Sequence, residues 1–254
     1  MPLPSCRRRA ALVLCAALPL ACIDSAAAGD LGHPWPTKGS GDVVAEIRSV
    51  GAFSSLSVDT GARVVVRQGD TASVVVKAEA NVVSLIDVRV DGDRLVVEDA
   101  SSFSSSTAEV TVTAKRLSGI EARGSVAVSA EGLNVPALSL SLGGSSAMSV
   151  KNSAFGKLHV ALGGSSTLRL SGTADDLSAA LGGSSALRAG ELAAGAVSVG
   201  AGGSAQAVVW AIGSLQVASA GSSGVAYFGA VHPTLATAGS STVRNLGTVP
   251  TRPQ

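Results

Sequence analysis

Hydrophobic and polar residues alternate along most of the chain after Asp42. Up to Leu117 the alternation falls into short runs rich in Val and separated by Gly, Asp and Ser, a pattern typical of half-buried β-strands. The expected strands are Val43 to Ile47, Ser55 to Val58, Ala62 to Arg67, Ser73 to Ala80, Ile86 to Val90, Arg94 to Glu98 and Ala108 to Ala114. Asp91-Gly92 predicts a hairpin between two of them, because glycine supplies the positive φ that a tight turn requires.

From Gly124 onward the alternation repeats about a Gly-Ser pair. The pairs begin at Gly124, Gly144, Gly164, Gly183, Gly203, Gly221 and Gly239, at spacings of 20, 20, 19, 20, 18 and 18 residues. The residues four before and four after each glycine are apolar in every copy, and mostly polar or small residues stand between them. Each flank of the glycine is therefore expected to be a strand with one buried face. Self-similarity at this period is typical of a solenoid.

These patterns predict an all-β fold in which coils of 18–20 residues stack as a parallel β-helix, or β-solenoid. The glycines are expected at corners, where the chain must turn sharply. A β-rich N-terminal portion is expected to continue or cap the first coils, because the end of a solenoid exposes strand edges. We predict a single domain over residues 42–245, made of a strand region (42–117) and the Gly-Ser coils (118–245), followed by a tail (246–254).

The first 28 residues are typical of a signal peptide. Arg7-Arg8-Arg9 precede an apolar stretch from Ala10 to Ile23, and Ala26-Ala27-Ala28 offers a cleavage site. The apolar stretch is shorter than the roughly 20 residues that span a bilayer, so we expect no membrane span after cleavage. A lipoprotein motif ending at Cys22 keeps open an outer-membrane lipoprotein as the alternative. Residues 29–41, rich in Gly and Pro, predict a linker.

Composition narrows the possible partners. All three cysteines lie within residues 1–28, so the mature chain is expected to lack disulfides and cysteine-based metal sites. Cleavage removes three Arg and one Asp, so basic residues fall from 19 to 16 and acidic residues from 18 to 17, a net charge near −1. No basic stripe is expected to remain, and we therefore predict no nucleic-acid partner.

We expect no catalytic, metal-binding or cofactor-binding residues. The Gly-Gly-Ser-Ser copies contain no carboxylate for a hard cation, and neither a lysine nor a helix follows them as in a phosphate loop. Asp175-Asp176 is the candidate carboxylate pair for polysaccharide cleavage, but a solvated turn is the favoured interpretation. His33, His159 and His232 have no evident partner for a nucleophilic triad.

The repeated corners also place serines above one another. The six central ones are Ser145, Ser146, Ser165, Ser166, Ser184 and Ser185. Stacked, they form a nearly uncharged ladder of hydroxyl groups that can face a ligand and bind a glycan or a protein through many weak hydrogen bonds. The alternative is that the serines only stack as part of the fold.

Several motifs in order resemble a known family. They are Arg48-Ser-Val-Gly-Ala-Phe53, Leu56-Ser-Val-Asp59, Val64-Val-Val-Arg-Gln-Gly69, Val90-Asp-Gly-Asp-Arg-Leu95 and Leu117-Ser-Gly-Ile120, which leads into the Gly-Ser coils. Over residues 44–245 the chain resembles the auto-transporter adhesin head GIN domain family of exported bacterial proteins. The resemblance implies a right-handed β-helix and a location in the cell envelope, and it carries over no catalytic residues.

Together these features predict a non-enzymatic exported binding or adhesin-like module, in the periplasm or cell envelope, whose Ser/Thr-rich surface meets a glycan or envelope protein. One alternative is a periplasmic structural or scaffolding protein that self-associates through its solenoid ends. A second alternative is a carbohydrate-active β-helix enzyme that uses Asp175 or Asp176.

Overall fold

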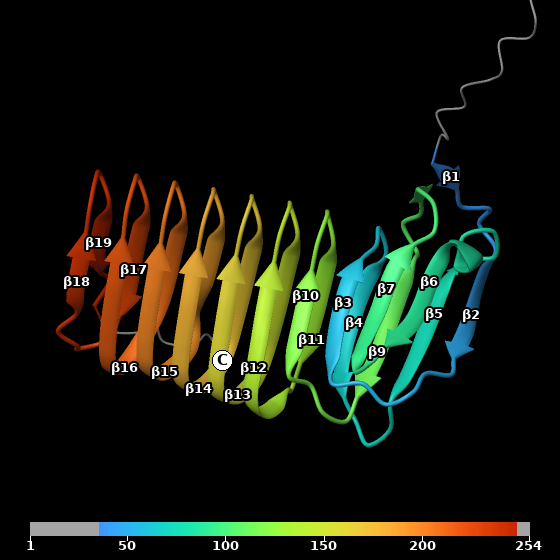
Figure 1. Cartoon of the computed structure of the whole chain (residues 1–254), viewed down its shortest axis with the longest axis horizontal. Helices are drawn as coiled ribbons and strands as arrows, with labels where there is room; N and C mark the ends of the chain where they lie inside the picture. Colours follow the sequence, from blue (N-terminus) through green and yellow to red (C-terminus); the bar gives the residue numbers. More distant parts are fainter. Residues whose placement is uncertain (1–35, 248–254) are drawn as a thin grey trace, which may run out of the picture. The chain divides into compact units, whose positions relative to one another are not determined.

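The computed structural model describes residues 36–247, and this part is all-β, without an α-helix (Figure 1). The predicted signal peptide with Cys22, residues 29–35 of the predicted linker and residues 248–254 of the tail lie outside the described residues. The N-terminal elements are β1 (Thr37–Lys38), β2 (Val43–Arg48), β3 (Ser55–Asp59), β4 (Arg63–Gln68), β5 (Ser73–Glu79), the 3₁₀ turn η1 (Val83–Leu85), β6 (Ile86–Asp91), β7 (Arg94–Asp99), β8 (Phe103–Ser104) and β9 (Glu109–Ala114).

The Gly-Ser repeat forms the coils of a β-solenoid. Its strands are β10 (Gly119–Ala122), β11 (Ala127–Glu131), β12 (Asn134–Leu142), β13 (Ala147–Leu162), β14 (Thr167–Leu181), β15 (Ala186–Ala201), β16 (Gln206–Ser219), β17 (Gly224–Phe228), β18 (Thr234–Thr237) and β19 (Thr242–Asn245). Adjacent coils pair in parallel, with Ala147 beside Thr167 and Thr167 beside Ala186. The predicted fold is therefore confirmed.

Each coil has two main faces that meet at the Gly-Ser corner. The pre-corner face is made of β10, β12, β18 and the final residues of β13 to β16. The post-corner face is made of β11, β17, β19 and the first residues of β13 to β16. In Figure 1 the chain rises along the pre-corner face, turns at the corner and descends behind while it advances from right to left, which is a right-handed path.

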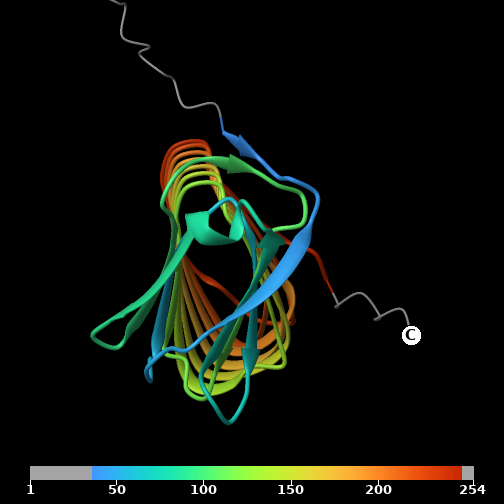
Figure 2. The same cartoon turned by 90° about the vertical axis from the view of Figure 1, so that its right-hand side faces the viewer.

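The N-terminal region both continues and caps the coils. β3 and β4 pair in parallel with β10 and β11, and on their other edges with β7 and β9. Beyond that layer the pairing becomes antiparallel, with β6 on β7, β5 on β9 and β2 on β5. Figure 2 looks onto this end, where the blue strand β2 crosses the end of the stack. The antiparallel strands cover the edges that a parallel layer would expose.

Most sequence-based predictions for this region are confirmed. All seven expected strands form, and Asp91-Gly92 lies in the turn of the β6–β7 hairpin, with Gly92 at φ +63°. The exceptions are two short segments expected to lack structure. Thr37–Lys38, assigned to the linker, forms β1, and Phe103–Ser104, which lies outside the seven expected strands, forms β8, because the two strands pair with each other.

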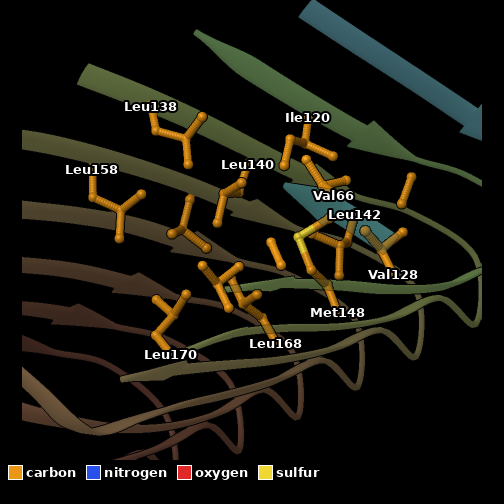
Figure 3. Packing of buried hydrophobic residues seen from close by; sticks show 14 of the residues in the cluster. Val66, Ile120, Val128, Leu138, Leu140, Leu142, Met148, Leu158, Leu168 and Leu170 are labelled. Atoms are coloured by element: carbon orange, nitrogen blue, oxygen red, sulfur yellow. The ribbon is translucent and has the colours of Figure 1, made fainter. Parts of the chain in front are cut away.

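The core lies between the two faces and is made of aliphatic columns. Leu140 and Leu142 project inward from the pre-corner face toward Met148, Leu168 and Leu170 of the post-corner face (Figure 3). These side chains are all at most 4% exposed. Full burial of each Leu or Met contributes about 1.5–3 kcal/mol, so the stacked columns supply the main stabilisation that a single coil lacks.

Candidate functional site

The Gly-Ser corners have nearly the same backbone geometry in every copy. The glycine that precedes the serine of each corner has φ between +66° and +79°, a left-handed conformation that glycine adopts without strain. A Cβ on Gly164 would lie 2.4 Å from the carbonyl oxygen of Gly144 directly beneath it. The corners stack through backbone hydrogen bonds, such as the 2.8 Å bond that the Ser165 amide donates to Gly144. Glycine is therefore required at this position.

The first serine of each corner lies on the surface. Ser145, Ser165 and Ser184 are exposed, and Ser204 and Ser222 continue the same column in the next two copies. Neighbouring members are separated by about 4.8 Å, the strand spacing. Within residues 36–247 their hydroxyl groups form no hydrogen bond, whereas their amides are bonded to the preceding corner. These three serines have the position expected of a ligand-facing ladder, and binding by them stays a prediction.

The second serine of each corner points inward, which corrects the prediction for half of the ladder. Ser146, Ser166 and Ser185 are at most 1% exposed, so they cannot face a ligand at the surface. Val126 and Ala205 occupy the equivalent position in other copies and are equally buried. The Ser146 hydroxyl donates a 2.9 Å hydrogen bond to the Gly143 carbonyl. Ser166 and Ser185 have no side-chain hydrogen bond within the described part of the chain. This position belongs to the core.

The pre-corner face beside the exposed serines is flat and built from small residues. Its outward columns contain Ser139, Ser141, His159, Ala161, Ser178, Ala180, Ser198 and Gly200. A shallow depression of about 570 Å³ lies on this face, lined by Ser, Ala, Gly and Leu and by no charged residue. Next to the corner serines this depression is an uncharged surface of small polar and apolar groups, whereas the same face carries the charged residues Glu121, Lys157 and Asp176 at other positions.

The candidate catalytic residues are not brought together into a site. Asp175 and Asp176 are both exposed within β14, and His159 lies outward on the pre-corner face. The strand neighbours of Asp176 are Lys157 and Ala196. His232 is exposed, and His33 lies outside the described residues. Among residues 36–247 no group of His, Cys, Asp and Glu side chains is arranged to hold a metal ion.

The charged groups with shifted pKa values lie in the N-terminal region and hold loops in place. Burial raises the pKa of Asp99, although this carboxylate accepts hydrogen bonds from the Thr60 hydroxyl and the Gly61 amide. The Ser105 hydroxyl lowers the pKa of Glu79 by donating a 2.5 Å hydrogen bond to it. Hydrogen bonds to Glu98 and Asp87 raise the pKa of Arg89. Each of these groups is paired with neighbouring residues of the N-terminal region.

The post-corner face differs from the pre-corner face because it carries arginines. Arg169 and Arg188 lie side by side on β14 and β15, both exposed and next to a hollow of about 520 Å³. Neither arginine is among the candidate residues predicted from the sequence. The signal was present, because each arginine lies five residues after a corner glycine and the two therefore share a column.

Comparison with known proteins agrees with this architecture. Residues 52–230 match the model of a family described as "Putative auto-transporter adhesin, head GIN domain". The chain belongs to this family. Membership confirms the resemblance found in the sequence, and it places the chain among proteins named as adhesins, a class of exported proteins. No curated protein matches the chain.

Of three solved structures with the same fold, two are named as adhesins and one as a lipid binding protein. A "putative adhesin" from Bacteroides fragilis NCTC 9343 has a TM-score of 0.73 at 20% identity, and the match covers 82% of this chain and 99% of that one. A second, from Parabacteroides merdae, has a TM-score of 0.66 at 18% identity and covers 83% and 98%. A "putative lipid binding protein" from Parabacteroides distasonis has a TM-score of 0.63 at 17% identity and covers 84% and 100%. At these identities the likeness concerns the fold alone.

In the part of the chain that the structure describes, no helix has the length and apolar character needed to cross a bilayer.

Proposed function

We propose that this protein is a non-enzymatic, exported binding module, adhesin-like in role, that presents its serine-rich solenoid surface to a glycan or to another protein of the cell envelope. The observation that carries the proposal is the uncharged surface formed by Ser145, Ser165 and Ser184 with the adjoining shallow depression of the pre-corner face. Many aligned hydroxyl groups favour a ligand that is itself extended and rich in hydrogen-bonding groups, as a glycan chain is.

Rigidity supports this proposal. The corner serines are held by backbone hydrogen bonds of 2.8 Å between successive coils, and their side chains extend from a fully packed core. A ligand that binds such a surface immobilises few protein side chains, so little conformational entropy is lost on binding. Export through the signal peptide at residues 1–28, with the alternative of lipid attachment at Cys22, supplies the envelope location that this role requires.

The experiment removes three hydroxyl groups from the surface. The purified mature protein is tested on a glycan array and in pull-down from envelope extract, beside the Ser145→Ala/Ser165→Ala/Ser184→Ala variant. We expect the triple variant to lose the wild-type ligands. The matched control, Ser101→Ala/Ser102→Ala/Ser106→Ala, removes three exposed serines between β7 and β9 and should retain them. The proposal fails if no ligand depends on the corner serines.

Exposed apolar residues at both ends of the described stack favour a second candidate, a scaffold that self-associates. Ile47 on β2 is 77% exposed, and Leu235 on β18 is 49% exposed although the equivalent residues of the preceding six copies are buried. Sedimentation over a range of concentrations tests this candidate. It predicts association that Ile47→Ser or Leu235→Ser weakens, and a monomer at all concentrations would contradict it.

A further inference from the structure

The post-corner face contains a groove that the serine surface does not include. Its main hollow, of about 520 Å³, is lined by Ser149, Lys151, Arg169, Arg188, Glu191 and Phe228 among others. A second hollow of about 220 Å³ adjoins it, shares Ser149 and Arg169 with it, and extends to Arg63. The groove therefore runs across several coils along the solenoid, and four cationic side chains line it against one carboxylate.

Arg169 and Arg188 are adjacent like charges without a neutralising partner. They lie directly opposite each other on paired parallel strands, about 4.8 Å apart at the backbone. Their outer neighbours in the same column are Ser149 and Val208, both uncharged. Neither guanidinium has an ion pair or a hydrogen bond within residues 36–247. Like charges directly opposite each other destabilise a sheet, so an anion bound between them would relieve a repulsion that the fold itself leaves in place.

Phe228 gives the groove an apolar wall. A Cβ on Gly190 would lie 3.2 Å from the Phe228 ring and 3.2 Å from Val208, so the ring packs over a position where the chain has no side chain. The strand pairing changes register between Ala189 and Ala193, which places Gly190 and Glu191 in an irregular segment beside the arginines. The groove thus combines two guanidinium groups, hydroxyl groups and one aromatic ring.

We propose that this groove binds an acidic sugar of a glycan chain, with its carboxylate held between Arg169 and Arg188. Guanidinium groups form two parallel hydrogen bonds with a carboxylate, and a pair of them can hold both oxygens. The Phe228 ring can pack against the apolar C–H face of a sugar ring, as aromatic rings do with apolar surfaces. Glu191 in the same groove disfavours ligands with dense negative charge, such as polyphosphates. This site lies on a different face from the serine surface and stands whether or not that surface binds a ligand.

Calorimetric titration of the whole protein with a short oligogalacturonate tests the proposal, and the neutral galactose oligomer of equal length serves as the reference ligand. We expect binding of the oligogalacturonate and none of the neutral oligomer. The Arg169→Gln/Arg188→Gln variant should lose at least about tenfold in affinity, because it loses charge-assisted hydrogen bonds. The Arg169→Lys/Arg188→Lys variant should bind weakly, since it keeps the charge but not the paired geometry. Glu191→Gln should bind more tightly.

The control variant Lys115→Gln/Arg116→Gln removes the same two charges from exposed positions outside the groove and should bind as the wild type does. If this control lost as much affinity as the Arg169→Gln/Arg188→Gln variant, the loss would be explained by net charge alone, and the proposal would be overturned. Wild-type protein that does not bind oligogalacturonate, or that binds inorganic phosphate or a sulfated oligosaccharide more tightly, would also overturn it. Retained binding by the Ser145→Ala/Ser165→Ala/Ser184→Ala variant would separate this site from the serine surface.

Discussion

The two sides of each coil, the Gly-Ser corner and the far side opposite it, differ in how much the backbone varies from one coil to the next. At the Gly-Ser corner seven copies keep one backbone conformation, and the first six stack on one another through the same hydrogen bond. On the far side, between the two strand faces, the pairing changes register between Val150 and Ser153, between Arg169 and Ser171, and between Ala189 and Ala193. All of the variation in coil length between 18 and 20 residues arises there. The backbone conformation is therefore constant at the corner, whereas the number of residues varies on the far side.

The corner is restricted sterically in the same way from coil to coil. There the stacked backbones approach too closely for a side chain, so a change in one copy collides with the next. Close approaches also occur on the far side, where a Cβ on Gly172 would lie 1.9 Å from the Ser153 carbonyl oxygen, but they do not recur at one position in every coil. Asn152, for example, adopts φ +50° at a register change, and its amide donates a 3.2 Å hydrogen bond to the Ser171 hydroxyl of the next coil. The groove with Arg169, Arg188 and Phe228 lies beside this far side, where the coil length varies.

The largest effect is expected from an alanine at the corner. Gly164→Ala combines a left-handed φ with a Cβ 2.4 Å from the Gly144 carbonyl oxygen, and we expect it to lower the free energy of unfolding by about 2–5 kcal/mol. In the adjacent control, Gly163→Ala, the nearest atom to the new Cβ is 3.9 Å away, so stability should hardly change. Guanidinium denaturation followed by circular dichroism measures both. Equal losses of stability in the two variants would show that the close approach at Gly164 does not determine the stability of the corner.

A deletion on the far side should cost less. Removing Asn152 shortens its coil to 19 residues, the length that the next coil already has. We expect the protein to fold with a loss of about 1–2 kcal/mol, partly because the bond from Asn152 Nδ2 to Glu131 disappears. Deletion of Gly163 is the matched change at the corner and should prevent regular stacking. If both deletions have the same effect on denaturation, the distinction between the two sides fails.

The inward serines should respond in opposite directions. Ser146→Ala removes a 2.9 Å hydrogen bond and should cost about 1 kcal/mol. Ser166→Ala removes a buried hydroxyl that lacks a partner among the described residues, so it should leave stability unchanged or raise it by up to about 1 kcal/mol. Denaturation midpoints of the two variants decide this. A large loss for Ser166→Ala would mean that its hydroxyl stabilises the corner.

The smallest effect on stability is expected at the exposed serines. The Ser145→Ala/Ser165→Ala/Ser184→Ala variant should unfold within about 0.5 kcal/mol of the wild type, because these side chains lie in solvent and form no hydrogen bond in residues 36–247. A larger loss in thermal denaturation would indicate that the corner hydroxyls are structural. In that case a change in ligand binding by this variant could not be assigned to lost contacts.

The sequence was sufficient to predict the coils because one rule, alternation about a glycine, repeats seven times. It also contained the information for the inward serines. Counting back from the buried Met148 in steps of two gives Ser146, and Val126 and Ala205 stand at the same place in other copies. The prediction of one six-serine surface was wrong because the two serines were treated as a pair, although adjacent residues of an extended chain point to opposite sides.

The groove and the order of the N-terminal layers could not be predicted in the same way. Arg169 and Arg188 share a column that the glycine spacing defines, but the contact between Phe228 and Gly190 depends on register changes that no local pattern encodes. The alternation of hydrophobic and polar residues likewise predicts which side of a strand is buried, but it does not predict which strand lies next to it. Nothing local in residues 94–114 indicates that they stack outside residues 55–68.

The stacking of β3 and β4 has a consequence for how the chain folds. Ser55 pairs with Arg94 on one edge of β3 and with Gly119 on the other, so two segments that follow each other in the chain take opposite edges of the same layer. The first segment contains β7 and β9, and the second contains β10 and β11. Both segments pair in parallel with the same two strands, β3 and β4. Only the first of them also pairs with antiparallel strands, β7 with β6 and β9 with β5. The cap therefore decides which segment takes which edge, and so the direction in which the solenoid grows.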